Sequence, residues 1–166
     1  MTSTTSPGPS VGPHLLPATA HSYLERAATS LRDSITARDV PTRYACAHVA
    51  ALCAAAALLA ARARPAPRGR RQKNAWVLLA EVAPELTEWA SFFAAGAGKR
   101  AAAEAGLSRA VTEREADDLV RDVGAFLAVV ETCLSASYGG LPAPDPARSP
   151  FTRPRVVGGS ASGLRR

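Results

Sequence analysis

Two side chains with chemical potential, Arg43 and His48, stand five positions apart on an otherwise apolar stretch of this 166-residue chain. A histidine can take up and return a proton near neutral pH. An arginine can stabilise negative charge on a phosphate. The first question is therefore whether the pair performs acid–base chemistry at a phosphate.

The spacing restricts how the pair could act. On a straight helix, residues five positions apart point about 140° away from each other. One phosphate reaches both only at a helix end, at a distortion, or at a two-fold interface where each subunit supplies part of the site. The geometry disfavours action by a monomer, and we expect a homodimer.

Two readings without catalysis stay open. In the first, His48 packs neutral beside Tyr44, and Arg43 stays at the helix start and pairs with Asp39. In the second, the pair contacts a substrate or nucleotide without reacting.

The pair lies on a predicted helix that runs to Ala63. Asp39 can cap its free backbone N–H groups, and Pro41 suits the first turn because its missing N–H has no partner there. The alanines that follow favour a helix and let another helix approach closely.

Other segments also have helical periodicity. One helix is expected from Thr19 or Ser22 to about Arg38, and another from Ala75 to about Ala83 behind an Asn74 cap. The inward face of the first comprises Tyr23, Leu24, Ala27, Ala28, Leu31 and Ile35. Pro84 kinks the second or starts a new helix, and the tryptophans 76 and 89 are expected to be core anchors.

The closing helix is predicted from a capping box, Thr112-Glu-Arg-Glu115, to about Ser135. Its inward residues are Leu119, Val123, Phe126, Leu127, Val130 and Leu134. Its acidic start suits a helix N-terminus and could also meet the basic connector at 68–73. No strand pattern is found, so the sequence predicts an all-α single bundle of four to five helices. The expected domains are a disordered leader (1–17), a helical domain (18–137) and a disordered basic tail (138–166).

Composition bounds the location and partners. Three widely spaced cysteines argue against a disulfide framework and fit a reduced setting. The longest apolar run has 13 residues, which is short for a membrane span, and the start lacks signal-peptide features. A cytoplasmic protein without membrane contact is expected. The net charge of +6 invites a nucleic-acid partner, although the tail carries +4 of it.

Most motifs for cofactors and metals are missing, including phosphate loops, paired metal-binding cysteines and zinc signatures. Cys46 and His48 would point roughly 200° apart on a helix. We therefore expect no cofactor and no metal, and packing roles for the cysteines.

The central region, roughly residues 18–137, resembles the HEPN superfamily of helical domains, and more narrowly an actinobacterial HEPN-like family. The likeness rests on Arg43-x4-His48 with its Ala-rich continuation to Arg64, on the stretch from Trp76 to Leu86, and on Gly98-Lys-Arg100. In active members, an arginine and a histidine four to six residues later cleave RNA without metal, usually across a dimer interface. Tyr44 departs from this pattern, because ribonucleases of the family often carry Asn, Asp or His directly after the arginine.

The resemblance implies a metal-independent ribonuclease or an RNA-binding protein of toxin–antitoxin or defence type. Arg43 would stabilise the phosphate and His48 would act as acid and base. The candidate RNA contacts are Tyr44, Arg68, Arg70, Arg71 and Lys73. A separately encoded antitoxin or nucleotidyltransferase would be the partner. The alternative is a non-catalytic helical interaction module that binds a partner protein or a nucleotide, in which His48→Ala costs stability rather than activity.

Overall fold

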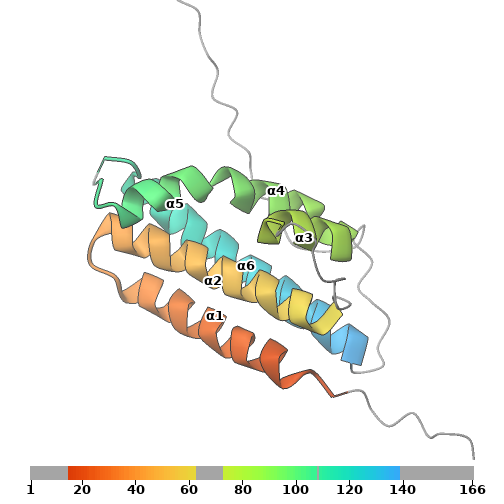
Figure 1. Ribbon diagram of the computed structural model, residues 1–166. Coiled ribbons are helices and arrows are strands. Elements are labelled where there is room, and N and C mark those ends of the chain that lie inside the picture. The colour runs from red at the N-terminus through yellow and green to blue at the C-terminus, as the bar shows by residue number, and fades with distance from the viewer. Residues whose placement is uncertain (1–14, 63–72, 108, 139–166) are drawn as a thin grey trace, which may run out of the picture.

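The structure is a computed structural model, and it describes residues 15–62, 73–107 and 109–138. Over these residues the chain is helical and contains no strand, which confirms the all-α prediction. Three long helices, α1, α2 and α6, and a series of short ones form a bundle (Figure 1). Their bounds are α1 Ala18–Thr36, α2 Val40–Arg62, α3 Ala75–Val82, the 3₁₀ turn η1 Pro84–Leu86, α4 Thr87–Ala95, α5 Ala97–Glu104 and α6 Glu113–Tyr138. The predicted leader and tail lie outside the described residues, except for Leu15–Pro17 and Tyr138.

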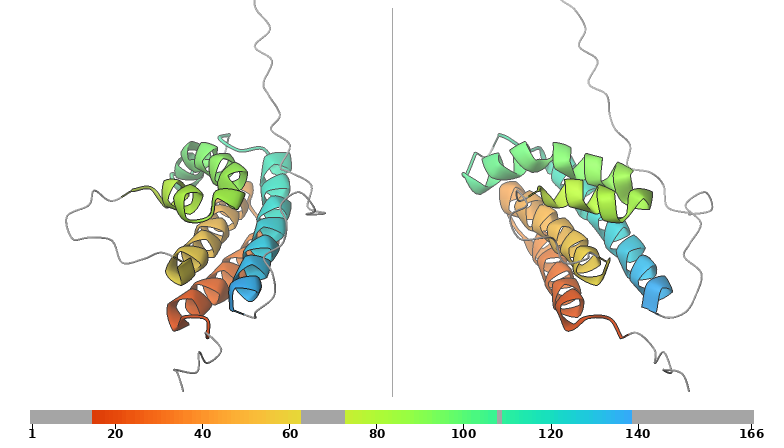
Figure 2. Two further views of the ribbon diagram at one scale, coloured as in Figure 1. Left: turned by 90° about the vertical axis from the view of Figure 1, so that its right-hand side faces the viewer. Right: turned by 45° about the vertical axis from the view of Figure 1, so that its right-hand side comes forward.

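The Ala-rich helix α2 is the centre of the bundle. It contacts α1, α3, α5 and α6, and the short helices lie on the side of α2 that faces away from α1 (Figure 2). Ten of its residues are buried, six of them alanines, so its neighbours approach closely. By length and mean hydropathy (1.9), α2 could also cross a membrane, which the 13-residue apolar run did not indicate. In the bundle, 56% of the 18-residue window of α2 that has this hydropathy is buried.

An aromatic cluster joins the short helices to α6. The ring of Phe93 lies 5.0–5.8 Å, between centroids, from the rings of Trp76, Trp89, Phe92 and Phe126. Both tryptophans are buried, as core anchors should be. This cluster fixes α4 against α3 and α6, and the site depends on that placement.

Local signals mark the predicted helix starts. The side chain of Asn74 accepts a hydrogen bond from the Trp76 N–H at 3.0 Å, and Pro84 opens the 3₁₀ turn. The capping box also forms, because Glu115 N–H donates to Thr112 Oγ1 (3.2 Å) and Thr112 N–H donates to Glu115 Oε2 (2.9 Å). The six residues predicted to face inward from α6 are all buried.

Two expectations for the long helices need correction. α6 continues past Ser135 to Tyr138, whose hydroxyl donates to the Ala61 carbonyl at 2.8 Å and joins the ends of α6 and α2. α1 ends at Thr36, and Ile35, expected to face inward, is 62% exposed. The buried residues of α1 are Ala20, Ala27 and Ser34, of which only Ala27 belongs to the predicted face; they share a face because they are seven residues apart.

Candidate functional site

Arg43 lies in the first turn of α2, where Asp39 caps the helix by accepting the Thr42 N–H at 2.9 Å. Its guanidinium turns away from that cap toward α6. Nη1 lies 2.6 Å from Asp117 Oδ1, and Nη2 donates to the Ala37 carbonyl at 3.4 Å. The expected pairing with Asp39 is therefore wrong, because Asp117 is the ion-pair partner.

The acidic start of α6 explains this choice. Glu113 lies 4.0 Å from Arg43, and Glu115 pairs with Lys99. The pKa of Glu115 is lowered to about 2. The hydrogen bond from Lys99 is the largest cause, and the bond from the Thr112 N–H is the next. This end of α6 thus contacts Arg43 and Lys99, while residues 68–72 of the expected basic partner lie outside the described residues.

His48 is enclosed in the core on another side of α2, with 1% of its surface exposed. Its Nε2 lies 3.0 Å from the carbonyl oxygen of Phe93. A carbonyl only accepts, so Nε2 carries the proton and Nδ1 is the unprotonated nitrogen. Nδ1 is also buried and has no hydrogen-bond partner among the described residues. The rings of Trp76 and Phe93 stand edge-on to the imidazole at 6.0 and 6.2 Å.

Burial lowers the pKa of His48 because it penalises the charged imidazolium. The hydrogen bond to Phe93 opposes this effect, and the positive charge of Arg100 adds to it. His48 is therefore held as a neutral imidazole in the folded protein.

Gly96, between α4 and α5, closes the space beside this imidazole. A Cβ atom there would lie 3.0 Å from Tyr44 Oη and 3.4 Å from His48 Cδ2 and Nε2. The backbone at position 96 can approach the side chains of Tyr44 and His48 this closely because glycine has no Cβ atom. The sequence does not single out Gly96, because its partners Tyr44 and His48 lie about 50 residues earlier in the chain.

Tyr44, the predicted RNA contact next to Arg43, is also part of the core. Its side chain is 5% exposed, and its ring centroid lies 6.5 Å from that of His48. Burial raises the pKa of its phenol, so the hydroxyl stays neutral. Tyr44, which stands where ribonucleases of the resembling family often carry Asn, Asp or His, packs against His48.

The two halves of the Arg-x4-His motif therefore have different surroundings. Arg43 contacts α6 and the α1–α2 connection, whereas His48 contacts α3 and α4. Among the described residues, no side chain or carbonyl bonds to both. The separation expected for this spacing is preserved, so one phosphate cannot engage both groups in this monomer.

The predicted basic contacts are only partly visible. Arg68, Arg70 and Arg71 lie outside the described residues, and Lys73 pairs with Glu81. The described residues hold eleven Lys and Arg against thirteen Asp and Glu, a net charge of −2, and seven of the eleven cations are in ion pairs. The net charge of +6 of the full chain therefore comes from residues outside the described ones.

Neither metal binding nor thiol chemistry finds support among the described residues. No group of three His, Cys, Asp or Glu side chains there could hold a metal ion. The three cysteines are free, and burial raises the pKa of each thiol, which keeps the thiolate scarce.

Comparison with known proteins adds the family. The family profile described as SAV_6107-like HEPN matches residues 34–131, which include α2 through most of α6. No curated protein and no solved structure matches the chain. The matched range covers more than half of the sequence and both halves of the motif, and it agrees with the resemblance noted from the residues. The chain is a member of the HEPN family.

Proposed function

We propose that this chain is a non-catalytic HEPN-like interaction module in which the Arg-x4-His motif stabilises the fold. One observation carries the proposal: His48 is buried, and its Nε2 hydrogen is donated to the Phe93 carbonyl. The Nε2 proton of His48, which acid–base catalysis would transfer, is held in a hydrogen bond within the core.

Acid–base catalysis needs an accessible imidazole. A general base must come within hydrogen-bond distance of the hydroxyl it deprotonates, directly or through one water. For His48, an RNA 2′-hydroxyl could reach that distance only after the segment around Phe93 and Gly96 had moved away. Such a movement would expose the aromatic cluster around Phe93, which stabilises the domain.

The surroundings of Arg43 also argue against catalysis at a phosphate. Its positive charge is balanced by Asp117 and Glu113, two carboxylates that would repel an incoming phosphate. The net negative charge of the described residues adds to that repulsion. Of the predicted RNA contacts, Arg68, Arg70 and Arg71 remain the better candidates, through their charge alone.

The resemblance also carries finer predictions. These are metal-independent ribonuclease activity, a toxin–antitoxin or defence role, a cytoplasmic location and a separately encoded antitoxin or nucleotidyltransferase partner. An enzyme of this kind would need a rearranged α4–α5 segment.

Incubating purified protein with RNA in the presence of EDTA tests the proposal. We expect wild type, His48→Ala and Arg43→Ala to leave the RNA intact, and only His48→Ala to lose substantial stability. Cleavage by wild type that disappears in both variants, while circular dichroism shows them folded, would establish the ribonuclease and refute the module.

A further inference from the structure

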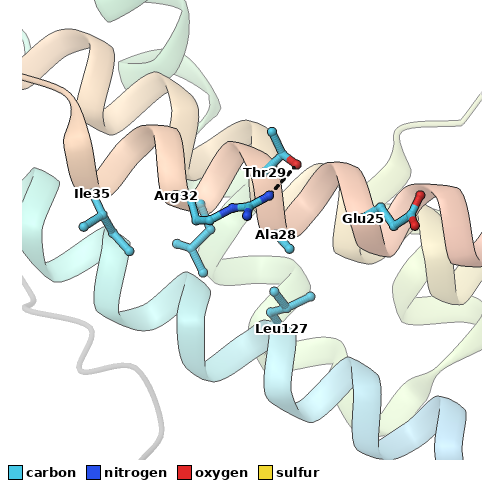
Figure 3. Close-up of a pocket in the computed structure, with 7 residues that line it drawn as sticks. Glu25, Ala28, Thr29, Arg32, Ile35 and Leu127 are labelled. Carbon is cyan, nitrogen blue, oxygen red and sulfur yellow. Dashed lines mark hydrogen bonds between the residues drawn. The ribbon is translucent and has the colours of Figure 1, made fainter.

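A groove between α1 and α6 leaves an apolar face of the bundle uncovered (Figure 3). It has a volume of about 660 Å³ and is lined by Glu25, Ala28, Thr29, Leu31, Arg32 and Ile35 of α1 and by Leu127 of α6. A second hollow of about 440 Å³ lies between the same two helices, near Leu24 and Leu134. The uncovered face thus extends along most of α1.

The packing of α1 explains the groove. α1 lies along α2 through the small residues Ala20, Ala27 and Ser34, and makes few contacts with α6. Its larger apolar side chains, including Leu31 and Ile35, are on the flank toward α6 and are only partly covered. Apolar side chains gathered in one exposed stripe are typical of a contact surface.

The charges at the groove match a second copy of the same face. Glu25 and Arg32 are seven residues apart, so they lie on one side of α1 about 10.5 Å from each other. Ala28 and Thr29, between them, are small enough for another helix to approach. Among the described residues, the Arg32 guanidinium bonds only to Thr29 (3.1 Å) and the Glu25 carboxylate only to the exposed His21 (3.4 Å), so both charges are available.

We propose that two copies of this chain associate through this face, with their α1 helices antiparallel about a two-fold axis between Ala28 and Thr29. In that arrangement Glu25 of each copy faces Arg32 of the partner subunit, which gives two identical ion pairs. Ile35 then packs on the N-terminal half of the partner's α1. The inference rests on the proposed interaction function, and it names the partner as a second copy.

This interface differs from the one that the sequence predicts. The homodimer expected from the motif spacing shares an Arg–His site at a two-fold interface, which would place α2 there, but α2 is enclosed by four neighbouring helices. The α1 face is on the other side of α2 from the short helices that cover His48 (Figure 2). The proposed dimer therefore does not assemble a shared Arg–His site.

Charge reversal tests the arrangement in the full chain. Sedimentation equilibrium is expected to give a dimer for wild type. Glu25→Arg alone or Arg32→Glu alone places like charges opposite each other twice, and should weaken dimerisation about tenfold or more. The double variant Glu25→Arg/Arg32→Glu restores both pairs with reversed sign and should return the dissociation constant to within about threefold of wild type. Val77→Glu, at an exposed position of α3, is the control and should change nothing.

A cysteine at the proposed axis tests the geometry directly. Thr29→Cys should form a disulfide-linked dimer under mild oxidation, and Val77→Cys should not. A wild-type chain that is monomeric at all concentrations, or a double variant as weak as the single ones, would overturn the inference. A monomer that leaves RNA intact refutes only this interface, whereas RNA cleavage lost in His48→Ala refutes the proposed function.

Discussion

The Nε2 atom of His48 lies 3.0 Å from the carbonyl oxygen of Phe93, 45 residues further along the chain. This bond joins the middle of α2 to the last turn of α4, inside the core. The same carbonyl also accepts the Gly96 N–H at 3.1 Å, so the His48 bond is the second of two that hold this end of α4. The histidine of the motif therefore acts as a structural link between the central helix and the short helices.

His48→Ala should lower the free energy of unfolding by about 3 kcal/mol, through the cavity left by the ring and the lost hydrogen bond to the Phe93 carbonyl, which keeps only the bond from the Gly96 N–H. His48→Gln keeps an N–H donor of similar reach and should lose less. Urea unfolding followed by circular dichroism measures both. A loss below about 0.5 kcal/mol for the alanine variant would show that the bond contributes little to stability.

Mild acid should destabilise the protein through the same residue. The pKa of His48 is lowered in the folded state, so below its ordinary value of 6.5 the unfolded chain binds more protons than the folded one. The contribution is fully present above pH 6.5 and is lost as pH falls toward the lowered pKa. The groups that face the imidazole are Tyr44, Arg100 and Glu104. Burial raises the pKa of Tyr44, so its hydroxyl stays neutral over this range.

Urea unfolding between pH 7.5 and 5.5 checks this prediction. His48→Gln has no imidazole and should be less sensitive to pH over that range. Glu115, whose pKa is lowered to about 2, loses its contribution only below its ordinary value of 4.5, so its effect falls in a separate window. An equal pH dependence in wild type and His48→Gln would mean that another group causes the loss.

Arg43→Ala should have a much smaller effect on stability than His48→Ala. The ion pair with Asp117 is partly exposed to solvent, where water and salt screen it, so about 0.5 kcal/mol is expected. The loss should shrink further in 0.5 M salt. A loss comparable to that of His48→Ala would contradict the separate roles assigned to the two motif residues.

Most of the fold could be predicted because its signals are local. The caps at Asn74 and Thr112 lie within three residues of the groups they bond, and the apolar period of α6 gives its inward face directly. The face of α1 was only partly predictable. Periodicity selects the most apolar stripe, which ends at Ile35, whereas close packing against the Ala-rich α2 selects the stripe of small residues.

The site depended on contacts that periodicity does not reveal. Asp117 is 74 residues from Arg43 and is one of several acids at the start of α6, so the sequence does not single it out. The partner of His48 is a backbone carbonyl, which every residue possesses. The separation of the motif residues around α2 was predictable, because it follows from helix geometry alone.

Gly96 offers the sharpest test of how closely α4 and α5 approach α2. In Gly96→Ala, the new Cβ would lie 3.0 Å from Tyr44 Oη, and the buried tyrosine has little room to move. We expect a loss of about 1–2 kcal/mol, because this crowding outweighs the better helix propensity of alanine. Chemical unfolding of the purified variant gives the value.

Two variants separate crowding from the change in propensity. Gly124→Ala, in the middle of α6 with no atom within 4 Å of the new Cβ, should be stabilised by about 0.5–1 kcal/mol. Tyr44→Phe removes the crowded oxygen, so Gly96→Ala should cost less in that background than in wild type. If the cost is the same in both backgrounds, the tyrosine hydroxyl is not what requires glycine at position 96, and the contact with the His48 ring remains as the cause.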